Sequence, residues 1–154
     1  MSESITRREM LAGTAAAGLC LSPTLRSLLA AETKPAFKIG ACDWSLGQHQ
    51  TPVALEVAKK IGLDGVEVSF DGGDRFDLRE QAVRKQYLEA SQKLGIEIPS
   101  LAMGLLNGVP YSSDPQAERW VGECVDVMAQ LKVKIVLLAF FGKGNIKGKT
   151  ELQE

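Results

Sequence analysis

The sequence predicts an α/β fold in which four parallel strands alternate with three helices. Segments of strand character occupy residues 37–44 and 66–70, part of 96–106, and 133–141. Successive strands begin about 30 residues apart, which is the length of one strand–helix unit. Two architectures fit this alternation, because right-handed crossovers between parallel strands produce either an open doubly wound sheet or a closed (β/α)8 barrel.

The clearest unit is the stretch TPVALEVAKKIGLDGVEVSF at residues 51–70. Thr51 is a favourable N-cap, and Pro52 suits the first helical position, where its missing N–H costs nothing. Gly62 stands where a helix ends in the left-handed conformation that glycine tolerates best. We therefore expect a helix, a tight turn and then a short buried strand at 66–70.

The second helix is predicted to begin near Asp77 and to end at Leu94, closed by Gly95. Asp77 and Glu80 resemble a capping box, in which the two side chains satisfy free N–H groups of the first turn. Apolar residues at helical spacing make its expected buried stripe: Val83, Tyr87, Ala90 and Leu94. Pro99 cannot donate a ladder hydrogen bond, so it marks the entrance of the third strand.

The third helix opens at Asp114 and Pro115. Its apolar side is expected to carry Trp120, Val121, Cys124, Val127, Met128 and Leu131. The strand at 133–141 is almost continuously apolar, which predicts a parallel strand covered on both faces.

Composition and charge exclude several classes of function. The 154 residues are 45% hydrophobic and 24% charged, as in an ordinary globular domain. With 18 basic and 19 acidic residues, the chain offers no electrostatic basis for binding nucleic acid or an anionic membrane. The three cysteines are too few and too widely spaced for a disulfide framework or a CxxC metal site, so we expect Cys42 and Cys124 to be buried free thiols.

The first 31 residues have the pattern of a secretory signal. Arg7 and Arg8 precede a weakly apolar run at 11–21, which is too short to span a bilayer stably, and small residues follow at 30–31. The paired arginines indicate the twin-arginine route, whose cargo is exported already folded. We expect a periplasmic protein, which stays tethered to the membrane if the signal is not cleaved.

Two loop motifs have simpler explanations than binding. Residues 142–150 end in Gly-Lys-Thr, but five residues separate Gly142 from Gly148 where a Walker A loop has four, and no helix is expected after them. Asp71, Asp74 and Asp77 do not match a calcium loop, so capping and solvation are expected to account for them.

Two further residues stand near the predicted strand ends. His49 is the only histidine and lies in a polar loop, where we expect it to be solvated rather than catalytic. Trp44 follows the first strand, at an edge where an aromatic side chain lines a pocket in either architecture. Core packing is an equally good interpretation of Trp44.

Three short runs resemble the xylose isomerase-like TIM-barrel superfamily, specifically its exported sugar phosphate isomerase/epimerase branch. They are Gly-Leu-Asp-Gly-Val-Glu at 62–67, Cys-Asp-Trp-Ser at 42–45 and Phe-Phe-Gly at 140–142. The resemblance implies a (β/α)8 barrel of which residues 32–154 form the N-terminal half, truncated to about four βα units. We therefore predict four parallel strands in sequential order, with the helices on the outer face only. It also implies a sugar or polyol substrate and a divalent metal, Mn, Mg or Zn. Proton transfer beside a sugar carbonyl would then use two carboxylates, one as base and one as acid.

The family's metal ligands, two Glu, one Asp and one His, come from the second half of the barrel, so none can be assigned here. We expect this chain to hold no catalytic residue and no metal ligand of its own. The resemblance leaves candidates for the wall of the substrate pocket: Asp43, Trp44, Glu67, Met103, Phe140 and Phe141. Glu67 could equally be a structural carboxylate inside the barrel.

Two functions from different classes follow. One is a metal-dependent sugar or sugar phosphate isomerase or epimerase, inactive as this half. The other is a non-catalytic half barrel that acts in binding or assembly and self-associates through its open sheet edges, with Val136, Leu138 and Phe140 near the contact. A nuclease of the same superfamily is disfavoured by the export signal and the absent basic surface.

Overall fold

The computed structural model describes residues 37–73 and 75–149, which, Phe37 apart, belong to a unit formed by residues 38–154. The predicted signal, with Arg7 and Arg8, lies outside the described residues. Four strands form one parallel sheet in the order β1-β2-β3-β4: β1 (Gly40–Cys42), β2 (Gly65–Ser69), β3 (Ser100–Met103) and β4 (Ile135–Leu138). The predicted α/β class and the sequential strand order are both confirmed.

Three α-helices connect the strands: α3 (Val53–Ile61), α4 (Gln81–Leu94) and α5 (Pro115–Leu131). The helix ends follow the local sequence, because Gly62 and Gly95 both adopt the left-handed conformation, with φ of 83° and 67°. At the start of α5, the Asp114 carboxylate accepts a hydrogen bond from the Gln116 N–H at 2.9 Å.

The predicted start of the second helix, near Asp77, is wrong. Asp77 closes a turn instead, because its carboxylate accepts the Arg79 N–H at 2.9 Å and its carbonyl accepts the Glu80 N–H at 3.0 Å. The helix therefore begins at Gln81. The side chain of a short polar residue accepts hydrogen bonds from nearby N–H groups both in turns and at helix N-caps. The sequence pattern does not distinguish a turn from an N-cap.

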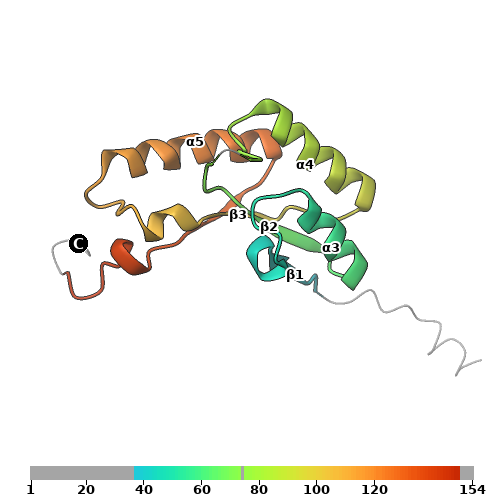
Figure 1. The fold of residues 1–154 in the computed structure, drawn as a ribbon, viewed down its shortest axis with the longest axis horizontal. Coiled ribbons are helices and arrows are strands. Elements are labelled where there is room, and N and C mark those ends of the chain that lie inside the picture. Colours follow the sequence, from blue (N-terminus) through green and yellow to red (C-terminus); the bar gives the residue numbers. More distant parts are fainter. Residues whose placement is uncertain (1–36, 74, 150–154) are drawn as a thin grey trace, which may run out of the picture. The chain divides into compact units, whose positions relative to one another are not determined.

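The core lies on one face of the sheet, between the strands and the helices. It includes Val66 and Val68 of β2 and Leu101 and Met103 of β3, which the strand register places on the same face. The helices contribute Leu55 of α3, Tyr87 of α4, and Cys124 and Leu131 of α5. In the view of Figure 1, α4 and α5 lie above this sheet.

The opposite face of the sheet changes character from one edge to the other. Its side chains on β1 to β3 are small or polar: Cys42, Glu67, Ser69, Ser100 and Ala102. On β4 they are large and apolar, and Ile135 and Leu137 are 62% and 42% exposed. The prediction that the last strand is covered on both faces is therefore wrong for the part of the chain that the structure describes, because its helices pack on the other face only.

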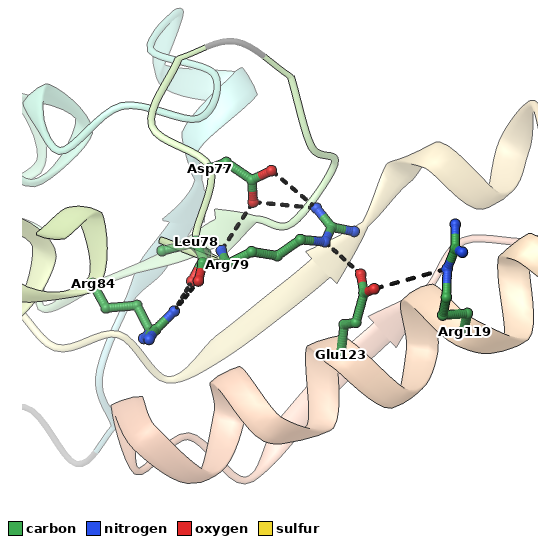
Figure 2. A network of polar contacts seen from close by, with 6 residues as sticks. All are labelled: Asp77, Leu78, Arg79, Arg84, Arg119 and Glu123. Atoms are coloured by element: carbon green, nitrogen blue, oxygen red, sulfur yellow. Dashed lines mark hydrogen bonds and ion pairs between the residues drawn. The ribbon is translucent and has the colours of Figure 1, made fainter. Parts of the chain in front are cut away.

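A polar network ties the loop between β2 and α4 to α5. Figure 2 shows the Arg79 guanidinium between two carboxylates: Nη1 contacts Asp77 at 3.2 Å, and Nε donates to Glu123 at 2.5 Å. The guanidinium carbon also lies 4.3 Å from the centre of the Phe70 ring. The loop is thus held in place at its second half, close to where α4 begins.

None of the helices in the described ranges is long and apolar enough to cross a membrane.

Candidate functional site

A cavity of about 370 Å³ opens at the carboxyl ends of the strands. Parallel α/β folds place their ligands at this edge, because the loops after successive strands converge there. The lining residues come from the ends of β3 and β4 and from the segments that follow all four strands. They are Trp44, His49, Asp71, Ala102, Gly104, Asn107, Leu137, Ala139 and Phe141.

The most distinctive polar feature of the cavity is a histidine–aspartate pair. The Nε2 atom of His49, in the loop after β1, lies 2.8 Å from Oδ2 of Asp71, which follows β2. The His49 side chain is half exposed and the Asp71 side chain is largely buried. Within the described residues, the other ring nitrogen of His49 has no hydrogen-bond partner, so it is free to meet a ligand.

The loop after β3 fixes the orientation of Asp71. Its Oδ1 accepts a hydrogen bond from the Leu105 N–H at 2.7 Å, so both carboxylate oxygens are engaged. A Cβ on Gly104 would lie only 3.1 Å from Oδ2, so a side chain there would press against the carboxylate. A histidine that lines a cavity and is oriented by a carboxylate is an arrangement suited to proton transfer.

Two of the six predicted wall residues line the cavity. Trp44 lies in the short helical turn η1 (Asp43–Leu46) and Phe141 follows β4, and they are 43% and 69% exposed. The Phe141 N–H donates to Asn107 Oδ1 at 2.9 Å, which ties this loop to the turn after β3. The two aromatic side chains give the cavity an apolar surface of the kind that small-molecule sites use.

Asp43 is fully buried and is not among the residues that line the cavity. Its Oδ1 accepts the Ser69 hydroxyl at 2.7 Å, and its Oδ2 accepts the N–H groups of Ser69 at 2.8 Å and Gln50 at 3.0 Å. The carboxylate thereby joins the end of β1 to the end of β2 and to the loop before α3.

Glu67 lies on the open face of the sheet and bridges three strands. Its two oxygens accept hydrogen bonds from the Cys42 thiol at 3.3 Å and the Ser100 hydroxyl at 2.7 Å. Burial, reinforced by Glu67, raises the pKa of Cys42 from its ordinary 9.0 to about 11, so this thiol is a poor nucleophile at neutral pH. Cys42 is only partly buried, whereas Cys124 is buried as expected.

The remaining candidates belong to the packing of the domain. Met103 is fully buried in the core, and Phe140 packs against the core with its ring 6.3 Å from that of Tyr111. Met103 lies on the helix-covered side of β3, whereas Ala102 and Leu137, which line the cavity, lie on the opposite face of the sheet.

His49 was expected to be solvated, and Asp71 to be explained by capping and solvation, so neither was predicted to lie in a site. Each follows a strand end, and that position is the signal that could have paired them. Asn107 was not considered, because nothing in its local sequence distinguishes it from any other turn residue.

The described residues do not fit a divalent-metal site. None of their histidine, cysteine and carboxylate side chains form a group of three or more that could hold an ion. Asp43 and Glu67 already use their oxygens for internal hydrogen bonds. A metal would therefore need ligands from outside the part of the chain that the structure describes.

Neither a comparison with protein-family models nor one with curated proteins finds a match to this chain.

Proposed function

We propose that residues 32–154 form the N-terminal half of a xylose isomerase-like (β/α)8 barrel and supply part of the binding wall for a sugar or polyol. The observation that carries this proposal is the His49–Asp71 pair in a cavity flanked by Trp44 and Phe141. A sugar presents apolar C–H faces and many hydroxyl groups, and this wall offers partners for both. The sequential strand order is also the order of one half of such a barrel.

Isomerisation or epimerisation needs a base, an acid and a group that stabilises the enediolate, and in the family a divalent metal supplies the last. The described residues provide a histidine oriented by a carboxylate but no metal site. The chain therefore binds substrate without turning it over, and catalysis requires the remaining barrel strands.

Tryptophan fluorescence tests the binding proposal. The full chain is titrated with uncharged ketoses and polyols, and the emission of Trp44 should change because this side chain lines the cavity. Trp44→Phe should abolish the response, while Trp120 on α5 remains as an internal reference. His49→Asn and Asp71→Asn should each weaken binding about tenfold, the usual cost of losing one good hydrogen bond.

Glu89→Gln is the matched control, because Glu89 is an exposed acid on α4 far from the cavity lining. A panel of sugars that leaves the Trp44 emission unchanged at tens of millimolar would contradict the proposal. Equal weakening by Glu89→Gln would show that the response is not specific to the cavity.

A second candidate function is assembly through the open side of the sheet. The residues expected near the contact, Val136, Leu138 and Phe140, pack against the core instead. The exposed apolar side chains at the edge strand β4 are Ile135 and Leu137, and Phe141 after it is 69% exposed. Exposed apolar edges favour pairing with another copy. Light scattering should therefore show a dimer or larger species that Leu137→Lys dissociates, whereas Val125→Lys, at an exposed valine of α5, should not. A monodisperse monomer of the unaltered chain would refute this function.

We further propose export through the twin-arginine route, on the sequence pattern alone. Replacing Arg7 and Arg8 by lysine should abolish accumulation in the periplasm, measured by cell fractionation. Undiminished periplasmic protein would refute the assignment.

A further inference from the structure

A hydrogen bond from the backbone fixes the side-chain amide of Asn107 in one orientation. Asn107 is the last residue of η2 (Gly104–Asn107), the helical turn that follows β3, and its Oδ1 accepts the Phe141 N–H at 2.9 Å. A backbone N–H can only donate, so it must meet the amide oxygen rather than the amide nitrogen. The Nδ2 atom is therefore the part of the amide that remains for another partner.

Close packing between two backbone segments holds this bond in place. A Cβ on Gly142 would lie 2.9 Å from the Asn107 carbonyl oxygen, and one on Gly144 would lie 2.3 Å from the Leu106 carbonyl oxygen. The segment after β4 therefore packs with its backbone directly on η2, at a distance that glycine alone permits. The Phe141 N–H and Asn107 both belong to this contact, so the amide cannot turn over without losing the hydrogen bond.

The remaining end of the amide belongs to the cavity at the strand ends. Asn107 lines that cavity and is half-buried. Its Nδ2 has no partner within the described residues, and it is not one of their fully buried atoms without a partner, which are Gln50 Nε2 and Tyr87 Oη, so solvent reaches it. The amide thus offers N–H donors whose acceptor has to come from a ligand or from water.

His49 provides the opposite kind of group to the same cavity. Its Nε2 is bonded to Asp71 Oδ2, and because an ionised carboxylate only accepts, Nε2 carries the proton in the neutral ring. Nδ1 is then an acceptor, and it has no partner in the ranges 37–73 and 75–149. The lining of the cavity therefore combines an acceptor that follows β1 with a donor that follows β3.

We propose that Asn107 is the specificity-determining residue of this cavity: its Nδ2 donates to a hydroxyl or carbonyl oxygen of the ligand and excludes a ligand with an ammonium group at the same place. An ammonium group has donors only, so it would meet the amide N–H groups without an acceptor and would lose its hydration. This inference rests on the proposed sugar-binding function, and it adds a choice between oxygen and nitrogen substituents that sugar binding alone does not require.

Calorimetry on the full chain tests the inference with a ketohexose and its mono-amino derivatives, each with one hydroxyl replaced by an ammonium group. The parent chain should bind at least one derivative about ten times more weakly than the ketohexose, which is the usual cost of one unmade hydrogen bond. Asn107→Asp keeps an oxygen for the Phe141 N–H but replaces the donor by a negatively charged acceptor. This variant should reverse the preference, so that the same derivative binds more tightly than the ketohexose.

Asn145→Asp is the matched control. The Asn145 Oδ1 also accepts a backbone N–H, that of Lys147 at 2.8 Å, but Asn145 is not among the described residues that line the cavity. The substitution adds the same charge and should leave the preference of the parent unchanged. Asn107→Ala removes the acceptor of the Phe141 N–H as well as the donor, so it should lower the melting temperature, whereas Asn107→Asp should keep it.

The outcomes separate this inference from the function on which it rests. If the parent binds the ketohexose and all of its amino derivatives equally well, Asn107 does not set specificity, and sugar binding stands. If Asn145→Asp reverses the preference too, attraction by overall charge explains the reversal, and the inference is overturned as well. An Asn107→Asp variant with the preference of the parent would show that the amide serves only to hold Phe141. If the parent binds neither the ketohexose nor any derivative, the sugar-binding function fails, and this inference fails with it.

Discussion

Replacing Asp43 by alanine should destabilise the domain strongly, and the structure gives the size of the effect. The fully buried carboxylate accepts the N–H groups of Ser69 and Gln50 and the Ser69 hydroxyl. Each buried N–H left without an acceptor costs about 1–3 kcal/mol, so the loss of both predicts roughly 2–6 kcal/mol. For a domain of this size, each kcal/mol lowers the melting temperature by about 4 °C, which predicts a fall of at least about 8 °C.

Urea and thermal unfolding of the full chain, followed by circular dichroism, measure this effect. Ser69→Ala removes only the hydroxyl bond and should cost about 1 kcal/mol. The double variant should lose less than the sum of the two, because the residues share one network. Asp126→Ala, at an exposed position of α5, is the control and should stay within about 0.5 kcal/mol of the parent. If Asp43→Ala keeps the parent's stability but loses sugar binding, Asp43 is a site residue and the structural assignment is wrong.

Three further predictions concern glycine packing, thiol ionisation and metal binding. A Cβ on Gly144 would lie 2.3 Å from the Leu106 carbonyl oxygen, so Gly144→Ala should lower the free energy of unfolding by about 1–3 kcal/mol, measured by calorimetry. Gly122→Ala is the control: this glycine lies in open space on α5, and the change should raise the free energy of unfolding by up to about 1 kcal/mol. Burial raises the pKa of Cys42 and Cys124 from 9.0 to about 11, so the unfolded chain loses these protons first. The contribution of the two thiols to stability should be constant below pH 9 and fall between pH 9 and 11. Replacing both by alanine should make the fall less steep, and an unchanged slope would contradict this. Titration with Mn²⁺ should show no tight binding by this chain, and micromolar affinity would mean that its residues form a site of their own.

The elements of this fold could be predicted from the sequence because their signals are local. Gly62 and Gly95 end helices through their own backbone freedom, and Asp114 caps α5 through a neighbour two residues away. The period of the apolar residues separates helix from strand without reference to the rest of the chain. The order of the strands could also be predicted, because strands that are consecutive in the chain usually lie side by side in the sheet.

Local signals could not predict which side chains of the last strand are buried and which are exposed. Ile135 and Val136 are equally apolar, yet only Val136 packs against the core. Which side chain is covered depends on the helices that return to the sheet, and that is a contact between distant parts of the chain. Asp43 shows the same limit, because its three hydrogen bonds join it to residues 7 and 26 positions away.

The candidate site depends on such distant contacts more than the fold does. Asp71 is separated by 22 residues from His49 and by 34 from Leu105, and it holds a hydrogen bond to each. One carboxylate therefore sets both the orientation of the imidazole and the position of the turn after β3. A Cβ on Gly104 would press on this carboxylate at 3.1 Å, so the orientation of the imidazole and the shape of the cavity both depend on the space at Gly104. Any change that moves Asp71 should alter sugar binding and the packing of that turn together, whereas a change at Trp44 should alter binding alone.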